Sequence, residues 1–113
     1  MDIQQPLTLL GGLSPSQFMR RHWQKKPLLV RQAIPQFSPP VLRADLFVLA
    51  AQEGVESRLV QLVKGVWKLR HGPFQRRSLP ALSQPDWTLL VQGVDLHHDA
   101  VNALMQQFRF VPE

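Results

Sequence analysis

The fold is decided by SPSQFMRRHWQKKPLLVRQA, residues 14–33. Ser14 predicts a helix N-cap, because its hydroxyl oxygen can accept a hydrogen bond from a backbone N–H of the first turn. Pro15 suits the first helical position, and Gln17 stands where a capping box needs a glutamine or a glutamate. We therefore expect a helix to begin at this point of the chain.

Pro27 predicts the end of this helix, since proline lacks an N–H and disfavours helical backbone in the residue before it. The apolar run Leu28–Val30 follows at once and predicts a short covered strand. Within the helix, Phe18 and Trp23 lie near one face, so we expect both side chains to pack against the core.

The middle of the chain predicts a helix followed by a hairpin. Leucines at helical spacing predict a second helix over residues 40–52, which Gly54 would end. Two strand-like runs, Arg58–Val63 and Val66–His71, flank Lys64-Gly65, which predicts a two-residue hairpin turn.

The last third predicts a loop, a strand and a helix. Residues 72–86 are rich in proline, serine and arginine and predict a long loop. Trp87–Val91 is a nearly continuous apolar run, which predicts a strand covered on both faces. An apolar stripe at helical spacing predicts a final helix over residues 96–107. The fold class is therefore α+β, with short helices and a small, mainly antiparallel sheet.

Composition restricts the class of protein. A length of 113 residues predicts one domain, and an apolar content of 44% is that of a globular protein rather than a disordered one. The chain has no cysteine, which excludes disulfides and thiolate metal sites. Its N-terminus lacks a signal-peptide pattern, and no apolar run approaches the roughly 20 residues of a membrane span. We therefore expect a cytoplasmic protein.

The charge balance is basic, with 13 Lys and Arg against 8 Asp and Glu. Arg70, Arg76 and Arg77 lie near one end of the hairpin, and such a surface attracts nucleic acid. A small basic adaptor that binds RNA or the ribosome is therefore one interpretation of the chain. Because the basic residues are spread along the sequence, an ordinary solvated basic surface is the other.

His97-His98-Asp99 matches H-x-D, two thirds of the triad that binds iron in non-haem oxygenases. The triad needs a second histidine after this pair, and no histidine follows Asp99 in the sequence given. An acidic residue at a helix start also offsets the positive end of the helix dipole. We therefore interpret Asp99 as a helix-start residue rather than as an iron ligand.

The remaining candidates favour structural roles. His22 beside Trp23 predicts a core or boundary histidine, and His71 at a strand end predicts a structural turn, with a loop facing a partner as its alternative. Trp67 and Trp87 lie in apolar periodic segments, which favour core packing over stacking on bases. No P-loop, dinucleotide-binding or nucleophile motif is present, so no catalytic, cofactor-binding or metal-binding residue is assigned.

Five segments together carry a family resemblance. They are HWQKKPLLVRQA at 22–33, SRLV at 57–60, WKLRHGPF at 67–74, WTLLVQGVD at 87–95 and ALMQQFRFVP at 103–112. In order and spacing they resemble the N-terminal region of the JmjC/cupin-type Fe(II)- and 2-oxoglutarate-dependent oxygenases, covering roughly residues 7–113. Within these enzymes they resemble the bacterial ribosomal oxygenases, which are ribosomal-protein arginine hydroxylases.

The resemblance implies what the chain contains and what it lacks. In this family the H-x-D pair, the distal histidine and the 2-oxoglutarate-binding residue follow the region that residues 1–113 resemble. We therefore expect an N-terminal fragment without the catalytic β-helix core, inert by itself, that binds no cofactor. The full-length parent is expected to be an enzyme that uses Fe(II) and 2-oxoglutarate on a ribosomal protein. Apolar surface left exposed would favour self-association.

Overall fold

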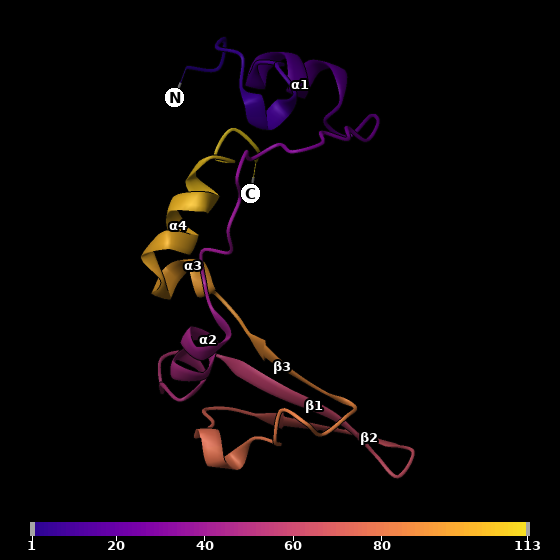
Figure 1. The fold of residues 1–113 in the computed structure, drawn as a ribbon. Coiled ribbons are helices and arrows are strands. Elements are labelled where there is room, and N and C mark those ends of the chain that lie inside the picture. The colour runs from indigo at the N-terminus through magenta and orange to yellow at the C-terminus, as the bar shows by residue number, and fades with distance from the viewer. Residues whose placement is uncertain (1, 113) are drawn as a thin grey trace. The chain divides into compact units, whose positions relative to one another are not determined.

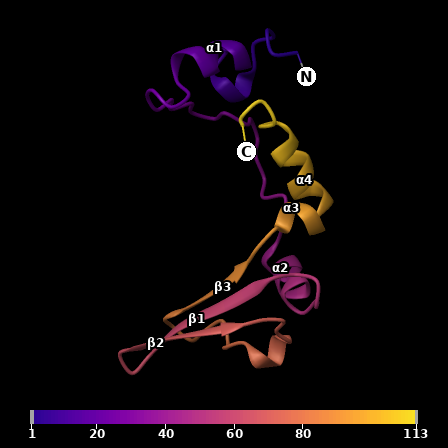
Figure 2. The same ribbon diagram turned by 180° about the vertical axis from the view of Figure 1, so that it is seen from behind.

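A computed structural model describes residues 2–112, which form two compact units. Within the described residues, one unit comprises residues 2–39 with 106–112, and the other comprises Pro40–Met105. Figures 1 and 2 trace the elements of each unit from two opposite sides. No helix within the described residues is long and apolar enough to cross a lipid bilayer.

The first unit contains the helix that the opening stretch predicts. Helix α1 spans Pro15–Arg21 and follows a short 3-10 turn at Thr8–Leu10. Ser14 Oγ accepts a hydrogen bond from the Gln17 backbone N–H at 3.1 Å, and Gln17 Oε1 accepts one from the Ser14 N–H at 3.0 Å. The predicted capping box is therefore confirmed, and it sits in a largely buried setting because Ser14 is only 3% exposed.

Two predictions for the rest of this stretch are wrong. Helix α1 ends at Arg21, well before Pro27, and the chain then turns through Gln24, whose φ is +56°. Leu28–Val30 forms no strand, and Leu29 is 77% exposed. A strand needs backbone partners as well as apolar side chains, and no described segment supplies them here.

The second unit is built on a three-stranded antiparallel sheet. Its strands are β1, Ser57–Val63, β2, Val66–His71, and β3, Trp87–Val91, in the order β2-β1-β3. Lys64 and Gly65 join β1 to β2 with φ of +50° and +77°, as a type I′ hairpin turn requires. The predicted hairpin and the α+β class are confirmed.

Helix α2, Arg43–Ala50, covers one face of this sheet. Asp45 Oδ2 accepts a hydrogen bond from the Leu42 N–H at 2.8 Å, which caps the helix start. The core combines side chains of β1, β3, α2 and the 72–86 loop, which contains a 3-10 turn at Arg76–Ser78. Its members are Leu59, Phe74 and Leu79, with Phe47, Trp87 and Leu89 packed against them.

The opposite face of the sheet has no covering element among the residues described, so two predictions are wrong. Burial alternates along β3, where Leu90 is 44% exposed, although cover on both faces was expected. Trp67 was expected in the core and is 70% exposed. Both side chains lie on the face that lacks this cover, and β2 is also an edge strand, all six of whose residues are exposed.

The predicted final helix is interrupted. Helix α3 covers Val94–His97, and α4 covers Asp99–Gln106. His98 between them has extended backbone, with φ −139° and ψ 117°. Its side chain explains the interruption, because a residue that caps a helix must itself leave the helical conformation.

Candidate functional site

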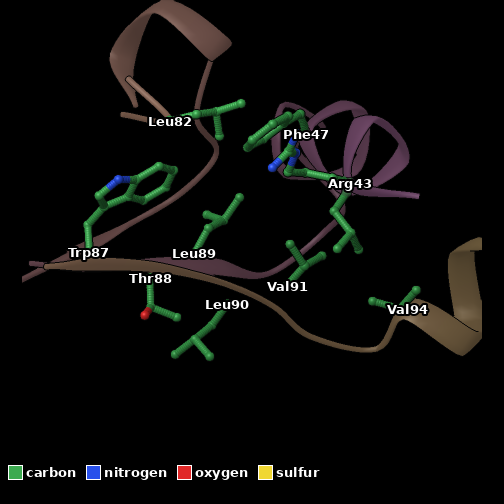
Figure 3. A pocket seen from close by; sticks show the side chains of 10 residues that line it. Arg43, Phe47, Leu82, Trp87, Thr88, Leu89, Leu90, Val91 and Val94 are labelled. Atoms are coloured by element: carbon green, nitrogen blue, oxygen red, sulfur yellow. The ribbon is translucent and has the colours of Figure 1, made fainter. Parts of the chain in front are cut away.

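A groove of about 530 Å³ lies between α2 and β3 in the second unit. Figure 3 shows Trp87, Leu89 and Val91 pointing from β3 toward the Phe47 side chain of α2. Leu82 from the long loop lies on the same side. This volume falls within the range of small-molecule sites, and the lining is mainly apolar.

Cationic side chains border this groove. Arg43, on α2, is part of its lining and lies one helical turn before Phe47. The Arg76 guanidinium stands 4.6 Å from the centroid of the Phe47 ring, and its Nη1 donates to the Pro80 carbonyl oxygen at 3.2 Å. The lining contains no carboxylate, histidine or cysteine, so the groove can hold an apolar group but offers no acid, base or metal ligand.

Arg43 was not among the candidate residues predicted from the sequence. Its signal in the sequence was the four-residue spacing from Phe47, which places both residues on one helix face. Among the lining residues, Thr88 and Leu90 project from β3 away from Phe47 (Figure 3).

The His97-His98-Asp99 segment lies at the junction of α3 and α4. His98 Nδ1 accepts a hydrogen bond from the Val101 N–H at 3.4 Å, which makes His98 the side-chain cap. Asp99 lies in the first turn of α4, as the helix-start interpretation predicts. His98 Nε2 also lies 3.9 Å from Asp45 Oδ2 on α2.

These residues do not fit an iron site. Three protein ligands are needed, and no three His, Asp or Glu side chains gather closely enough anywhere in residues 2–112. The His98 imidazole, between His97 and Asp99, already holds the helix start through Nδ1.

The other two histidines, His22 and His71, belong to different units. His22 is half-buried, stacks on the Phe18 ring at 6.0 Å and places Nδ1 3.3 Å from the Pro27 carbonyl oxygen. This is the boundary position that was predicted. His71 is exposed at the end of β2, opposite Arg58 of β1.

The three arginines near the hairpin end do not form one patch of side chains without intramolecular contacts. Arg70 Nη2 donates to the Ser78 carbonyl oxygen at 3.1 Å, and its guanidinium lies 5.7 Å from the Phe74 ring centroid. Arg76 is held by Phe47 and Pro80. Two of the three arginines therefore brace the long loop against the sheet unit.

Comparison with known proteins gives the same relatives by sequence and by structure, although no family model matches the chain. The ribosomal protein uL16 3-hydroxylase of Escherichia coli is 40% identical over 96 residues, 85% of this chain and 25% of that protein. A probable ribosomal oxygenase of Haemophilus influenzae is 30% identical over 102 residues, 89% of this chain and 25% of that protein.

Among solved structures, the ribosomal oxygenase YcfD of Escherichia coli superposes with a TM-score of 0.71 at 39% identity, over 88% of this chain and 27% of that one. A second YcfD structure, in complex with cobalt and 2-oxoglutarate, gives 0.69 at 39% identity, over 84% and 26%. The chain thus spans about a quarter of the length of its relatives. The resemblance to the ribosomal oxygenases, in their N-terminal part, is confirmed.

Proposed function

We propose that this chain, which is related to the ribosomal oxygenases over most of its length, supplies the N-terminal region of an Fe(II)- and 2-oxoglutarate-dependent oxygenase. The observation that carries the proposal is 40% identity over 96 residues to the uL16 3-hydroxylase, together with a superposition at TM-score 0.71. The reaction of the whole enzyme would be hydroxylation of an arginine side chain on a ribosomal protein. Such a substrate would place the enzyme in the cytoplasm.

The role of these 113 residues in that enzyme is structural. The groove between α2 and β3 lacks acid–base groups, and His98 caps the start of α4. We therefore assign catalysis, iron binding and 2-oxoglutarate binding to residues outside this chain. The second unit contributes a folded sheet with one covered face, on which a larger protein can build.

A chimera tests this proposal. Residues 1–113 replace the matching region of the Escherichia coli uL16 3-hydroxylase, and mass spectrometry measures the gain of one oxygen atom by uL16. We expect the chimera to hydroxylate uL16 and the 113-residue chain alone to leave it unchanged. An inactive but folded chimera would refute the family role, and hydroxylation by the isolated chain would refute the assignment of catalysis elsewhere.

Two substitutions in the chimera separate the roles of the H-x-D motif. Asp99→Asn and His97→Ala should both leave hydroxylation within about twofold of the unsubstituted chimera, because neither side chain would bind iron. A loss of activity with normal folding in either variant would instead identify an iron ligand within this chain.

A weak contact with RNA is a second candidate, favoured by where the cations lie. The first unit carries Arg20, Arg21, Lys25, Lys26 and Arg31, all exposed. Neutralising phosphates with such residues releases counterions, so binding weakens steeply with salt. Fluorescence anisotropy with single-stranded RNA at rising salt tests this. Affinity that does not fall with salt, or no binding at low salt, would refute it.

A further inference from the structure

The outer edge of β2 has no strand paired with it among the described residues. Val63 and Val66 flank the two-residue turn and form a hydrogen-bonded pair, so pairing alternates from there along the ladder. The bond from the Gly72 N–H to the Ser57 carbonyl oxygen, at 2.8 Å, shows that the alternation persists to the far end. Val66, Lys68 and Arg70 therefore direct their backbone groups to β1.

The alternate residues of β2 direct their backbone N–H and C=O groups outward, away from β1. These are Trp67, Leu69 and His71, which we call the open edge. An unpaired row of this kind is a template for another strand. No backbone hydrogen bond joins the open edge to any described residue outside the strand pair.

The side chains along β2 divide into an apolar row and a basic row. Trp67 and Leu69 are 70% and 55% exposed and share the face of the sheet that α2 does not cover. Lys68 and Arg70 are also exposed and share the other face. Arg70 is anchored on Ser78, whereas Lys68 makes no ion pair with any described residue.

A second copy of β2 fits this edge poorly. Directly opposed residues of antiparallel strands place their side chains on the same face, so a symmetric pair must be centred on one residue. Centring on Leu69 would oppose Lys68 to Arg70, and centring on Lys68 would oppose Lys68 to itself. Centring on Trp67 would oppose Arg70 to Lys64. Like charges directly opposite destabilise a strand pair, so each register carries a penalty.

We propose that the open edge of β2 binds an extended protein segment in which apolar and acidic residues alternate. Main-chain hydrogen bonds to Trp67, Leu69 and His71 would hold the segment as a fourth strand. Its apolar side chains would lie beside Trp67 and Leu69 on the uncovered face. Its carboxylates would lie beside Lys68 and Arg70 on the other face, where opposite charges favour the pair.

Two synthetic peptides test the chemistry of the segment. One alternates valine with glutamate, and the other alternates valine with lysine, at equal length. We follow the backbone amide signals of the ¹⁵N-labelled chain during titration. The glutamate peptide should shift Trp67, Leu69 and His71 and bind about tenfold more tightly than the lysine peptide.

A charge reversal sharpens the test. Lys68→Glu should weaken binding of the glutamate peptide about tenfold and bring the lysine peptide to equal or better affinity. Lys64→Glu, in the turn just outside β2, is the matched control and should change the preference much less. Equal binding of both peptides to the wild-type chain would show unspecific apolar adhesion and overturn the proposal.

A proline substitution tests the backbone contact. The Leu69 N–H points away from β1, so Leu69→Pro keeps the β1–β2 ladder and removes an outward donor. Binding of the glutamate peptide should be lost, whereas Leu69→Thr should retain it. Should Leu69→Pro not fold, the Lys68→Glu preference still decides the proposal. No binding by either peptide, or concentration-dependent shifts of the same amides without peptide, would overturn it, the latter in favour of a second copy.

Discussion

The two faces of the three-stranded sheet have a similar apolar content but different surroundings. On the covered face, Leu59 is fully buried, and Phe74 and Leu79 close over it. On the open face, Trp67, Leu69 and Leu90 remain largely exposed. The alternation of a strand decides which side chains share a face, but only a covering element turns that face into a core.

The largest expected effect tests the covered face at its centre. Leu59→Ala should lower the free energy of unfolding by about 2–5 kcal/mol, because it leaves a cavity where the side chain is fully buried. Leu69→Ala on the open face is the matched control and should cost less than about 0.5 kcal/mol. Urea unfolding followed by tryptophan fluorescence measures both. Equal costs would contradict the difference between the faces.

A second substitution tests how tightly the covered face closes where β2 ends. A methyl group on Gly72 would collide with Ser57 Oγ and lie 3.2 Å from the Phe74 ring. Gly72→Ala should therefore destabilise the chain by about 1–3 kcal/mol.

The matching variant is Ser57→Ala, which removes the oxygen that collides. Ser57 Oγ is buried and has no hydrogen-bond partner among the described residues, so this change alone should cost little. The double variant should recover part of the loss of Gly72→Ala in urea unfolding. Costs that simply add would show that Phe74 or the backbone, rather than Ser57, limits the space.

The local parts of the fold were predictable because local chemistry determines them. Ser14 and Gln17 specify the helix start by their own hydrogen bonds, and Lys64-Gly65 specifies the hairpin by its backbone conformation. The absence of a strand at Leu28–Val30 was not predictable, since strand pairing depends on backbone groups far away in the sequence.

The same reason limits what the sequence says about sites. Trp67 has the pattern of a core residue, and its exposure follows only from its place on the uncovered face of an edge strand. The helix-start role of Asp99 was predictable from its own position, whereas the capping role of His98 required the break between α3 and α4. The open edge becomes visible only once the strand order is known.

A smaller effect tests the loop that closes the covered face. Arg76→Gln should cost about 0.5–1 kcal/mol, because the guanidinium loses its position over the Phe47 ring. Arg77→Gln, one residue further along the same 3-10 turn, is the control and should be nearly neutral. Thermal unfolding monitored by circular dichroism compares the two variants. If both lose the same stability, net charge rather than the contact with Phe47 is responsible.

The smallest expected effect is on the open face. Trp67→Ser should change the free energy of unfolding by less than about 0.5 kcal/mol, although a buried tryptophan costs several times more when it is truncated. Trp87→Ser, on the covered face, should cost clearly more because Trp87 packs against the core. Urea unfolding at two chain concentrations measures both variants. If Trp67→Ser costs as much as Trp87→Ser at high concentration only, a second copy covers the open face. If it does so at both concentrations, the open face is covered within the chain itself, and the difference between the two faces of the sheet disappears.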